Sequence, residues 1–179
     1  MGCLAQHEEP VVNLDKLTYA GNIKSLASLL GNPKHIFIKG DIRDTVLVTH
    51  LLMQYQPRAV INFAAESHFN MSIHGPGEFI QTNIVATFNL LESVRGYWTG
   101  MPQENRDGVV APTKSGFRFL HVSTDEVYGS LKKDDPAFTE ISHIEPTAYS
   151  ARKEASDHLV RAWHHTYVLP VLTTNSSNN

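Results

Sequence analysis

Five short runs of apolar, largely β-branched residues alternate along this chain with longer amphipathic segments. The runs are nearly continuous in apolar residues, as expected of parallel strands that are covered on both faces. They occupy residues 11–15, 35–42, 59–65, 117–124 and 168–175. The segments between them have the apolar spacing of helices and span residues 45–56, 76–98 and 148–167. This alternation predicts an α/β fold with a Rossmann-like, doubly wound parallel sheet.

Several residues stand where these runs end. Asp15 closes the first run, Asp41 follows the second, and Ala64 and Thr124 lie at the ends of two others. Ligands of such sheets lie across the carboxyl ends of the strands, and an acidic residue there can bind ribose hydroxyls. Each residue taken alone is equally well explained as a turn residue or a helix cap. Their joint placement favours a ligand site.

Two further pairs carry chemistry. Asp125 and Glu126 directly follow the fourth run, and ionised carboxylates at such a place are costly unless they are paired or face a cleft. Tyr149 and Lys153 stand four residues apart on one face of the last helix. A nearby ammonium favours the phenolate and makes tyrosine a usable base. The spacing alone also fits an ordinary exposed pair.

Several motifs together resemble one family, the dTDP-glucose 4,6-dehydratases of the extended short-chain dehydrogenase/reductase superfamily. The resemblance covers nearly everything from Val11 onward, and the combination of STDEVYG with YSxxK is its most specific part. The other matching stretches are NLDKLTYAGN, FAAESH, SIHGPGEFIQTNIVATFNLLE and TNSSNN.

The resemblance implies an NAD-dependent lyase that oxidises a nucleotide sugar transiently and eliminates water from it. Tyr149 would take the C4 hydroxyl proton as hydride leaves for NAD, with Thr124 hydrogen-bonded to the same oxygen and Lys153 supporting the phenolate. Glu126 would remove the C5 proton, and Asp125 would protonate the departing C6 hydroxyl. Two carboxylates held in different protonation states can divide acid and base work in this way.

The resemblance also implies the binding residues for NAD and dTDP-glucose. Substrate contacts would come from Ser67, Thr124, Asn178 and Asn179, with Glu66 as a further candidate. Cofactor contacts would come from Asp15, Lys16, Asp41, Ile42, Ala64, Ala65, Thr82, Tyr149, Lys153 and Asn178. The chain departs from the family's usual residues at Asn70, Met71, Arg152, Val168 and Ser176, where Asp, Arg, Ser, Gly and Cys are usual.

The ends of the chain differ from the family pattern. Residues 1–10 supply neither a first strand nor a Gly-rich turn of the GxxGxxG kind, which would hold a pyrophosphate. We expect residues 11–179 to form a partial NAD-binding domain, with the C-terminal substrate domain absent. In the strand order 3-2-1-4-5-6 the missing strand is central, so two lost ladders should leave its neighbours flanking a gap.

The composition bears on partners and location. A formal net charge of −3 gives no basic surplus for nucleic acid, and no apolar run approaches the ~20 residues of a membrane helix. The lone Cys3 excludes an internal disulfide and fits a reducing cytoplasm. The ten histidines form no HExxH motif, so we expect no metal site.

A seam on residues 76–98 suggests self-association. Its members recur at alternating spacings of four and three, and small residues form a stripe on the last helix. The two helices, 76–98 and 147–167, could make a four-helix homodimer interface. Packing on the chain's own sheet explains the seam equally well. The seam consists of Ile80, Ile84, Thr87, Leu91, Val94 and Trp98, and the stripe of Ala148, Ala151, Ala155 and Ala162.

Two other functions stay open at this point. One is another NAD-dependent nucleotide-sugar enzyme, an epimerase or decarboxylase. The adjacent carboxylates Asp125 and Glu126 favour a dehydratase, because simple epimerisation needs no acid and base for the loss of water. The other is a catalytically silent module that dimerises.

Overall fold

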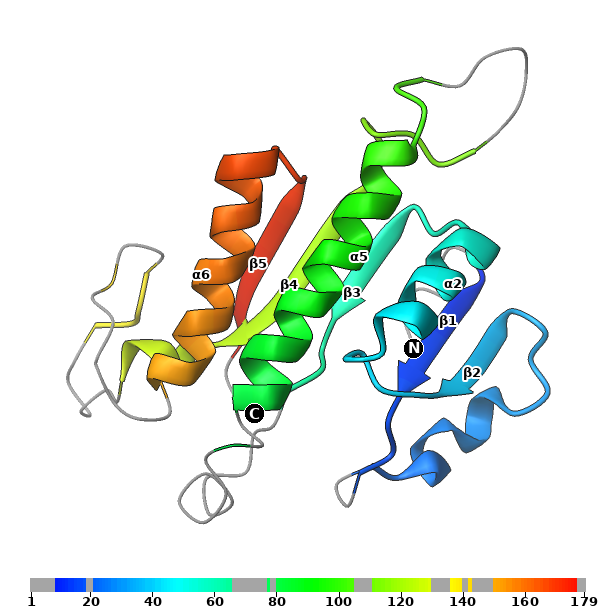
Figure 1. The fold of residues 1–179 in the computed structure, drawn as a ribbon. Coiled ribbons are helices and arrows are strands. Elements are labelled where there is room, and N and C mark those ends of the chain that lie inside the picture. The colour runs from blue at the N-terminus through cyan, green and yellow to red at the C-terminus, as the bar shows by residue number, and fades with distance from the viewer. Residues whose placement is uncertain are drawn as a thin grey trace.

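The fold was obtained as a computed structural model, which describes residues 9–18, 21–65, 77, 80–104, 111–129, 136–139, 142 and 150–176. Five parallel strands form two sheets (Figure 1). The first sheet pairs β1 (Val11–Asp15) with β2 (His35–Lys39), and the second has the order β3 (Ala59–Asn62), β4 (Arg118–Thr124), β5 (Val171–Ser176). The prediction of an α/β fold with parallel strands is confirmed.

The helices lie between the strands in sequence, as the alternation predicts. They are α2 (Thr45–Tyr55), α5 (Ala86–Gly100), which continues a π-helical segment η2 (Ile80–Val85), and α6 (Ser150–Tyr167). Two 3₁₀ helices, η1 (Ile23–Leu29) and η3 (Asp125–Tyr128), complete the described elements. Figure 1 shows α2, α5 and α6 on one face of the sheets. None of the described helices combines the length and the apolar content that a membrane span needs.

Local sequence explains where α2 begins and ends. The side chain of Asp44 accepts a hydrogen bond from the backbone N–H of Leu47 at 2.9 Å, which caps the first turn. At the other end Gln56 adopts a left-handed conformation with φ of 45°, and its N–H donates to the carbonyl of Leu52. Pro57 follows and cannot continue the helix.

No ladder joins β1 to β3 in the described part of the chain, since β1 pairs only with β2 and β3 only with β4. Among the described residues, strand pairing therefore does not connect the two sheets. The side chains of Ile61 and Phe63, on and just after β3, are 45% and 72% exposed. Exposure of this kind is unusual for a parallel strand, which is normally covered on both faces.

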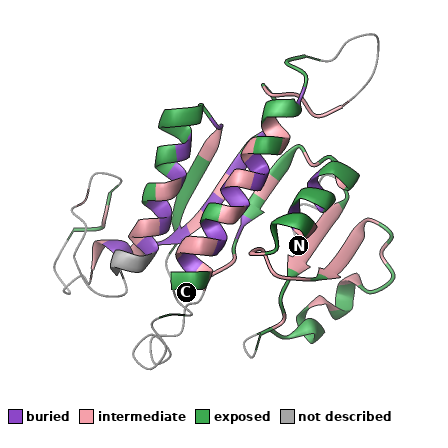
Figure 2. Cartoon of the chain, in the orientation of Figure 1, coloured by how far each residue is buried: buried purple, intermediate pink, exposed green. Residues whose placement is uncertain are grey.

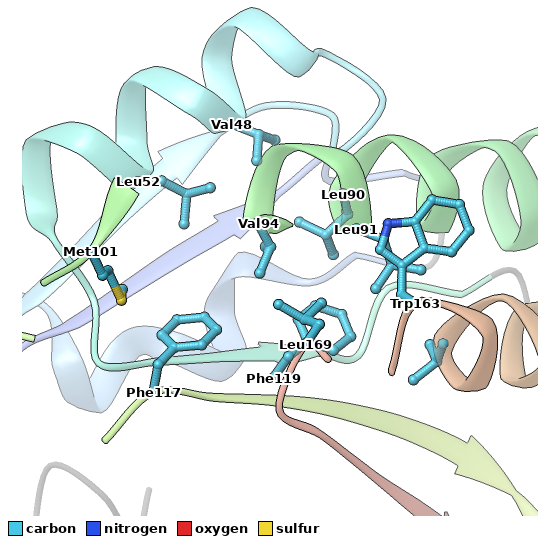
Figure 3. Packing of buried hydrophobic residues seen from close by; sticks show 11 residues of the cluster. Val48, Leu52, Leu90, Leu91, Val94, Met101, Phe117, Phe119, Trp163 and Leu169 are labelled. Carbon is cyan, nitrogen blue, oxygen red and sulfur yellow. The ribbon is translucent and has the colours of Figure 1, made fainter. Parts of the chain in front are cut away.

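One apolar core connects the two sheets through their helices. Val48 and Leu52 of α2 belong to the same buried cluster as Leu90, Leu91 and Val94 of α5 (Figure 3). The cluster continues to β4 and α6 through Phe117, Phe119, Val160, Trp163 and Leu169. Figure 2 shows this buried stripe along the inner side of α5.

The core favours the intramolecular explanation of the apolar seam on residues 76–98. Leu91 and Val94 are fully buried and Thr87 is 1% exposed, so the centre of the seam packs within the chain. Heptad-like spacing specifies an apolar partner without saying which one, and here the sheet and α2 provide it. The helical backbone also ends at Gly100, two residues later than predicted.

The backbone conformation at Val168 shows why glycine is usual at this position of the family. Its φ is 59°, in the left-handed region that favours glycine, and its N–H donates to the carbonyl of His164 at 2.9 Å. A β-branched residue is strained in this conformation, and its 68% exposed side chain gains little packing in return.

We expect Val168→Gly to stabilise the chain by about 1 kcal/mol, because relief of the backbone strain outweighs the greater freedom of glycine in the unfolded chain. Urea unfolding would show a higher midpoint with an unchanged slope. Val168→Ala still places a Cβ in the left-handed conformation, so it should raise the urea midpoint by less. A lower midpoint for the glycine variant would contradict this account.

Candidate active site

The turn after β4 carries three of the predicted catalytic residues. Thr124 ends the strand and accepts a hydrogen bond at its hydroxyl from the backbone N–H of Glu126, at 3.3 Å. Asp125 and Glu126 occupy the first turn of η3, which the buried Val127 anchors at 1% exposure. Glu126 is exposed and Asp125 half-buried. Both carboxylates therefore avoid full desolvation and stand at the carboxyl end of a buried strand.

Lys153 brings α6 into the same site. The residue is only 6% exposed. Burial lowers the pKa of Lys153, and the negative charges of Asp157 and Glu126 oppose part of that shift. The electrostatic interaction with Glu126, together with the packing of α6 against η3, brings Lys153 close to the turn that carries the STDEVYG motif.

A buried polar network that the sequence reasoning missed lies under this turn. His121 on β4 is 2% exposed, and its Nε2 lies 3.2 Å from Oδ1 of Asp157. Ser123 donates from its hydroxyl to Oδ2 of Asp157 at 2.8 Å. Nδ2 of Asn62, at the end of β3, lies 3.3 Å from Nδ1 of His121. The sequence contains one signal for this network, because Asp157 stands four residues after Lys153 and the two residues therefore share one face of the helix.

A second group gathers at the carboxyl ends of β1 and β2. Gly40 permits a close approach, because a Cβ there would overlap the side chains of Leu47 and Leu14. Asp41 follows, and its Oδ2 accepts from Nε and Nη2 of Arg43 at 2.9 and 2.8 Å.

The two strand ends at this edge are also linked to each other. Nζ of Lys16 lies 3.0 Å from the Asp41 carboxylate. The exposed Asp15 accepts the N–H of Leu17 at 2.6 Å. Asp15, Lys16, Asp41 and the half-buried Ile42 therefore lie at the same edge of the first sheet.

Arg43 and Lys16 give Asp41 a stabilising role of its own. Burial alone would raise the pKa of Asp41, but hydrogen bonds from Arg43 and Lys16 outweigh it and hold the pKa well below 3.8. A lowered folded-state pKa means that the carboxylate stabilises the fold above its unfolded pKa and loses this contribution as the pH falls.

We expect Asp41→Asn to lower stability at neutral pH by up to about 1 kcal/mol, because the pairs are partly exposed. The difference between the two proteins should shrink as the pH falls below 3.8. Urea unfolding at several pH values measures it. Arg43→Gln should remove much of the pH-dependent stability that Asp41 contributes. A stability difference between Asp41→Asn and the unsubstituted chain that grows in acid would contradict the role given to Asp41.

Some of the remaining predicted residues lie in the described part of the chain, and others lie outside it. Ala64 donates its N–H to Oδ1 of Asn62 at 3.1 Å, Ala65 is half-buried beside it, and the half-buried Thr82 lies in η2. Ser176 ends β5 directly opposite Thr124. Outside the described residues lie Glu66, Ser67, Asn70, Met71, Tyr149, Asn178 and Asn179, together with the side chain of Arg152.

The arrangement has the parts of a dinucleotide and sugar site. An exposed carboxylate and an ammonium at the end of one sheet fit the hydroxyls of a ribose, and a buried lysine beside two carboxylates fits proton transfer. The 179 residues include no GxxGxxG run to approach a pyrophosphate. The residues thus fit NAD at its two ends.

Comparison with known proteins relates the chain to a family. Residues 2–179 match the family model described as GDP-mannose 4,6 dehydratase. The dTDP-glucose 4,6-dehydratase of Xanthomonas campestris pv. campestris (strain B100) is 63% identical over 170 residues, which are 94% of this chain and 46% of that protein.

Two solved structures of dTDP-glucose 4,6-dehydratases are also similar. The Bacillus anthracis protein in complex with NAD has a TM-score of 0.79 and 35% identity, over 99% of this chain and 49% of that one. The Streptomyces venezuelae protein with NAD and TYD bound has a TM-score of 0.79 and 38% identity, over 97% and 48%. The chain spans about half the length of the relatives that it matches.

Proposed function

Because this chain belongs to the GDP-mannose 4,6 dehydratase family, we propose that it carries the catalytic residues for dehydrating dTDP-glucose to dTDP-4-keto-6-deoxyglucose. One observation carries the proposal: the Thr124–Glu126 turn at the end of β4 lies beside the buried Lys153 of α6. The similarity to dTDP-glucose 4,6-dehydratases supports the choice of sugar nucleotide.

NAD, when bound, supplies the redox chemistry by accepting a hydride from the sugar and returning it. Lys153 holds positive charge at the site and, with Tyr149, favours removal of the C4 hydroxyl proton. Thr124 positions the C4 oxygen through its hydroxyl. Glu126 is exposed and takes the C5 proton, while Asp125 donates a proton to the leaving C6 hydroxyl.

The remaining assignments follow the same pattern. Asp15, Lys16, Asp41 and Ile42 bind the adenosine end of the cofactor, and Ala64, Ala65, Thr82 and Asn178 line its path. Ser67, Asn178 and Asn179 bind the substrate. The lone Cys3 supports a cytoplasmic location as part of this proposal.

An epimerase or decarboxylase would share the fold and the cofactor. The adjacent carboxylates Asp125 and Glu126 favour dehydration, because the loss of water needs a proton donor and a proton acceptor, whereas simple epimerisation does not. A silent dimerising module would need neither carboxylate.

A chimera tests the function. Residues 11–179 of this chain replace the matching segment of the Xanthomonas dehydratase, and the 4-keto-6-deoxy product is measured from dTDP-glucose. We expect turnover within about tenfold of the parent, since a tenfold change corresponds to only 1.4 kcal/mol in the barrier. A folded chimera that binds NAD but forms no product would support the silent module, and a C4 epimer as product would support the epimerase.

We also propose a homodimer formed by the outer faces of α5 and α6. Phe88 and Tyr167, 43% and 42% exposed, each stack edge-on against Trp163 with ring centroids 5.5 and 5.7 Å away. Arg95 lies over the Tyr167 ring at 4.7 Å. An exposed aromatic cluster with arginine has the composition of an interface core.

Phe88→Asp is expected to convert the dimer to a folded monomer, because it places a charge in a desolvated contact. Light scattering together with circular dichroism measures both properties. Val46→Asp changes a residue that is 80% exposed on α2 and should leave the assembly intact. Leu91→Asp should instead prevent folding. A folded Phe88→Asp dimer would exclude this interface.

A further inference from the structure

The buried network under the η3 turn has a defined direction of hydrogen bonding. The N–H of Ala64 donates to Oδ1 of Asn62, which identifies the oxygen of that amide. The amide nitrogen therefore faces Nδ1 of His121 at 3.3 Å, and an amide NH₂ can only donate. Nδ1 must accept, so a neutral His121 carries its proton on Nε2.

Nε2 of His121 and Oδ1 of Asp157 lie 3.2 Å apart without forming a hydrogen bond, and neither atom has a hydrogen-bond partner among the described residues. Oδ2 of the same carboxylate accepts from the Ser123 hydroxyl at 2.8 Å. Ser123 therefore orients the Asp157 carboxylate, and neither Ser123 nor a neutral His121 cancels its charge.

A buried charge of this kind needs a counter-ion. Asp157 is 7% exposed, and an unpaired carboxylate at that depth is strongly destabilising. Lys153 is 6% exposed, stands one helical turn earlier on the same face of α6, and interacts electrostatically with Asp157. Each of the two buried charges therefore compensates the other.

The other elements packed on α6 offer few alternatives. From η3 comes Glu126, which also acts on Lys153, and from β4 comes His121. On α5, Glu92 and Arg95 pair with each other, at 2.8 Å. Tyr97 of α5 donates its hydroxyl proton to the carbonyl of Pro57 at 3.1 Å. The η2 and β5 segments contain no titratable residue.

We propose that Asp157 is a positioning residue, whose carboxylate, oriented by Ser123, keeps the Lys153 side chain charged and fixed in the site. Through Asn62 the same network reaches the backbone of Ala64 at the end of β3, so it ties three elements of the site together. The catalytic meaning of this arrangement rests on the proposed function, but the charge of Lys153 does not.

The test measures Lys153 directly, without substrate or cofactor. The ¹³Cε resonances of lysine are followed through a pH titration of the chain, and Lys153→Met identifies the relevant signal. Asp157→Asn should lower the pKa of Lys153 by about 1–3 units, the effect of losing an adjacent opposite charge. Glu154→Gln removes the same charge from a neighbouring residue that pairs with the exposed His158. This variant should change the pKa of Lys153 by less than about 0.5 unit.

Two further measurements keep the test decisive if Asp157→Asn fails to fold. In the unsubstituted chain, the Asp157 ¹³Cγ resonance should shift at the pH where Lys153 titrates, and this shift should vanish in Lys153→Met. Long-range ¹H–¹⁵N spectra should show His121 as the neutral Nε2–H tautomer. The proposal would be overturned if the pKa of Lys153 were the same in Asp157→Asn and Glu154→Gln. It would also be overturned if the Asp157 resonance did not respond to the titration of Lys153, even if the chimera is active. If Lys153 and Asp157 titrate as expected but the chimera is inactive, only the proposed function is rejected.

Discussion

Replacing Glu126 with glutamine in the chimera is expected to abolish dehydration while sugar oxidation continues. The amide keeps the shape of the side chain and its place in the first turn of η3, but it cannot accept the C5 proton. General-base catalysis contributes roughly 10²–10⁴-fold, so product formation should fall by about that factor. Oxidation at C4 depends on Tyr149 and Lys153 instead and should proceed.

Single-turnover absorbance of NADH separates the two steps. In the parent chimera the signal should rise and decay, whereas in Glu126→Gln it should rise and persist. Asp125→Asn should behave similarly, because it removes the proton donor for the C6 hydroxyl. Glu154→Gln, a change on α6 at a half-buried residue that pairs with the exposed His158, serves as the matched control. Product formed at the parental rate by both amide variants would refute the assigned roles.

The strands could be predicted from sequence because each is a short apolar run, but their ends could not. The second run was expected to reach residue 42, yet β2 stops at Lys39, because Gly40 starts the close turn that leads to the Asp41 contacts. The last strand was expected from residue 168 and begins at Val171. There the left-handed Val168 and the missing N–H of Pro170 delay the ladder.

The candidate site was predictable where its residues are adjacent in sequence and hidden where they meet only in the fold. Thr124, Asp125 and Glu126 follow one another, so their motif was visible. His121 and Asp157 are brought together by the packing of α6 on β4, and in the sequence only the position of Asp157, four residues after Lys153, hints at this contact. The partner of the apolar seam could not be predicted for the same reason, since Leu91 specifies burial but not the partner that buries it.

We expect the 179-residue chain to purify without NAD and to bind it more weakly than about 100 µM. The pyrophosphate in such folds is held by backbone N–H groups of a Gly-rich turn, and no GxxGxxG run occurs in these residues. Each lost charge-assisted hydrogen bond costs roughly 1.5–3 kcal/mol, so the loss of two or three weakens binding by several powers of ten.

The contacts that remain cannot offset this loss. The carboxylate of Asp41 already accepts hydrogen bonds from Arg43 and lies 3.0 Å from Lys16, so it has little free capacity to bind the adenosine end more tightly. Lys153 lies on α6, which packs on the second sheet, and no ladder connects that sheet to β1 in the described part of the chain, so the two ends of the cofactor site are not held in register by strand pairing. Calorimetry with NAD on the chain, run beside the chimera, tests the prediction. Micromolar binding by the chain alone would contradict it and would mean that residues outside those assigned here hold the pyrophosphate.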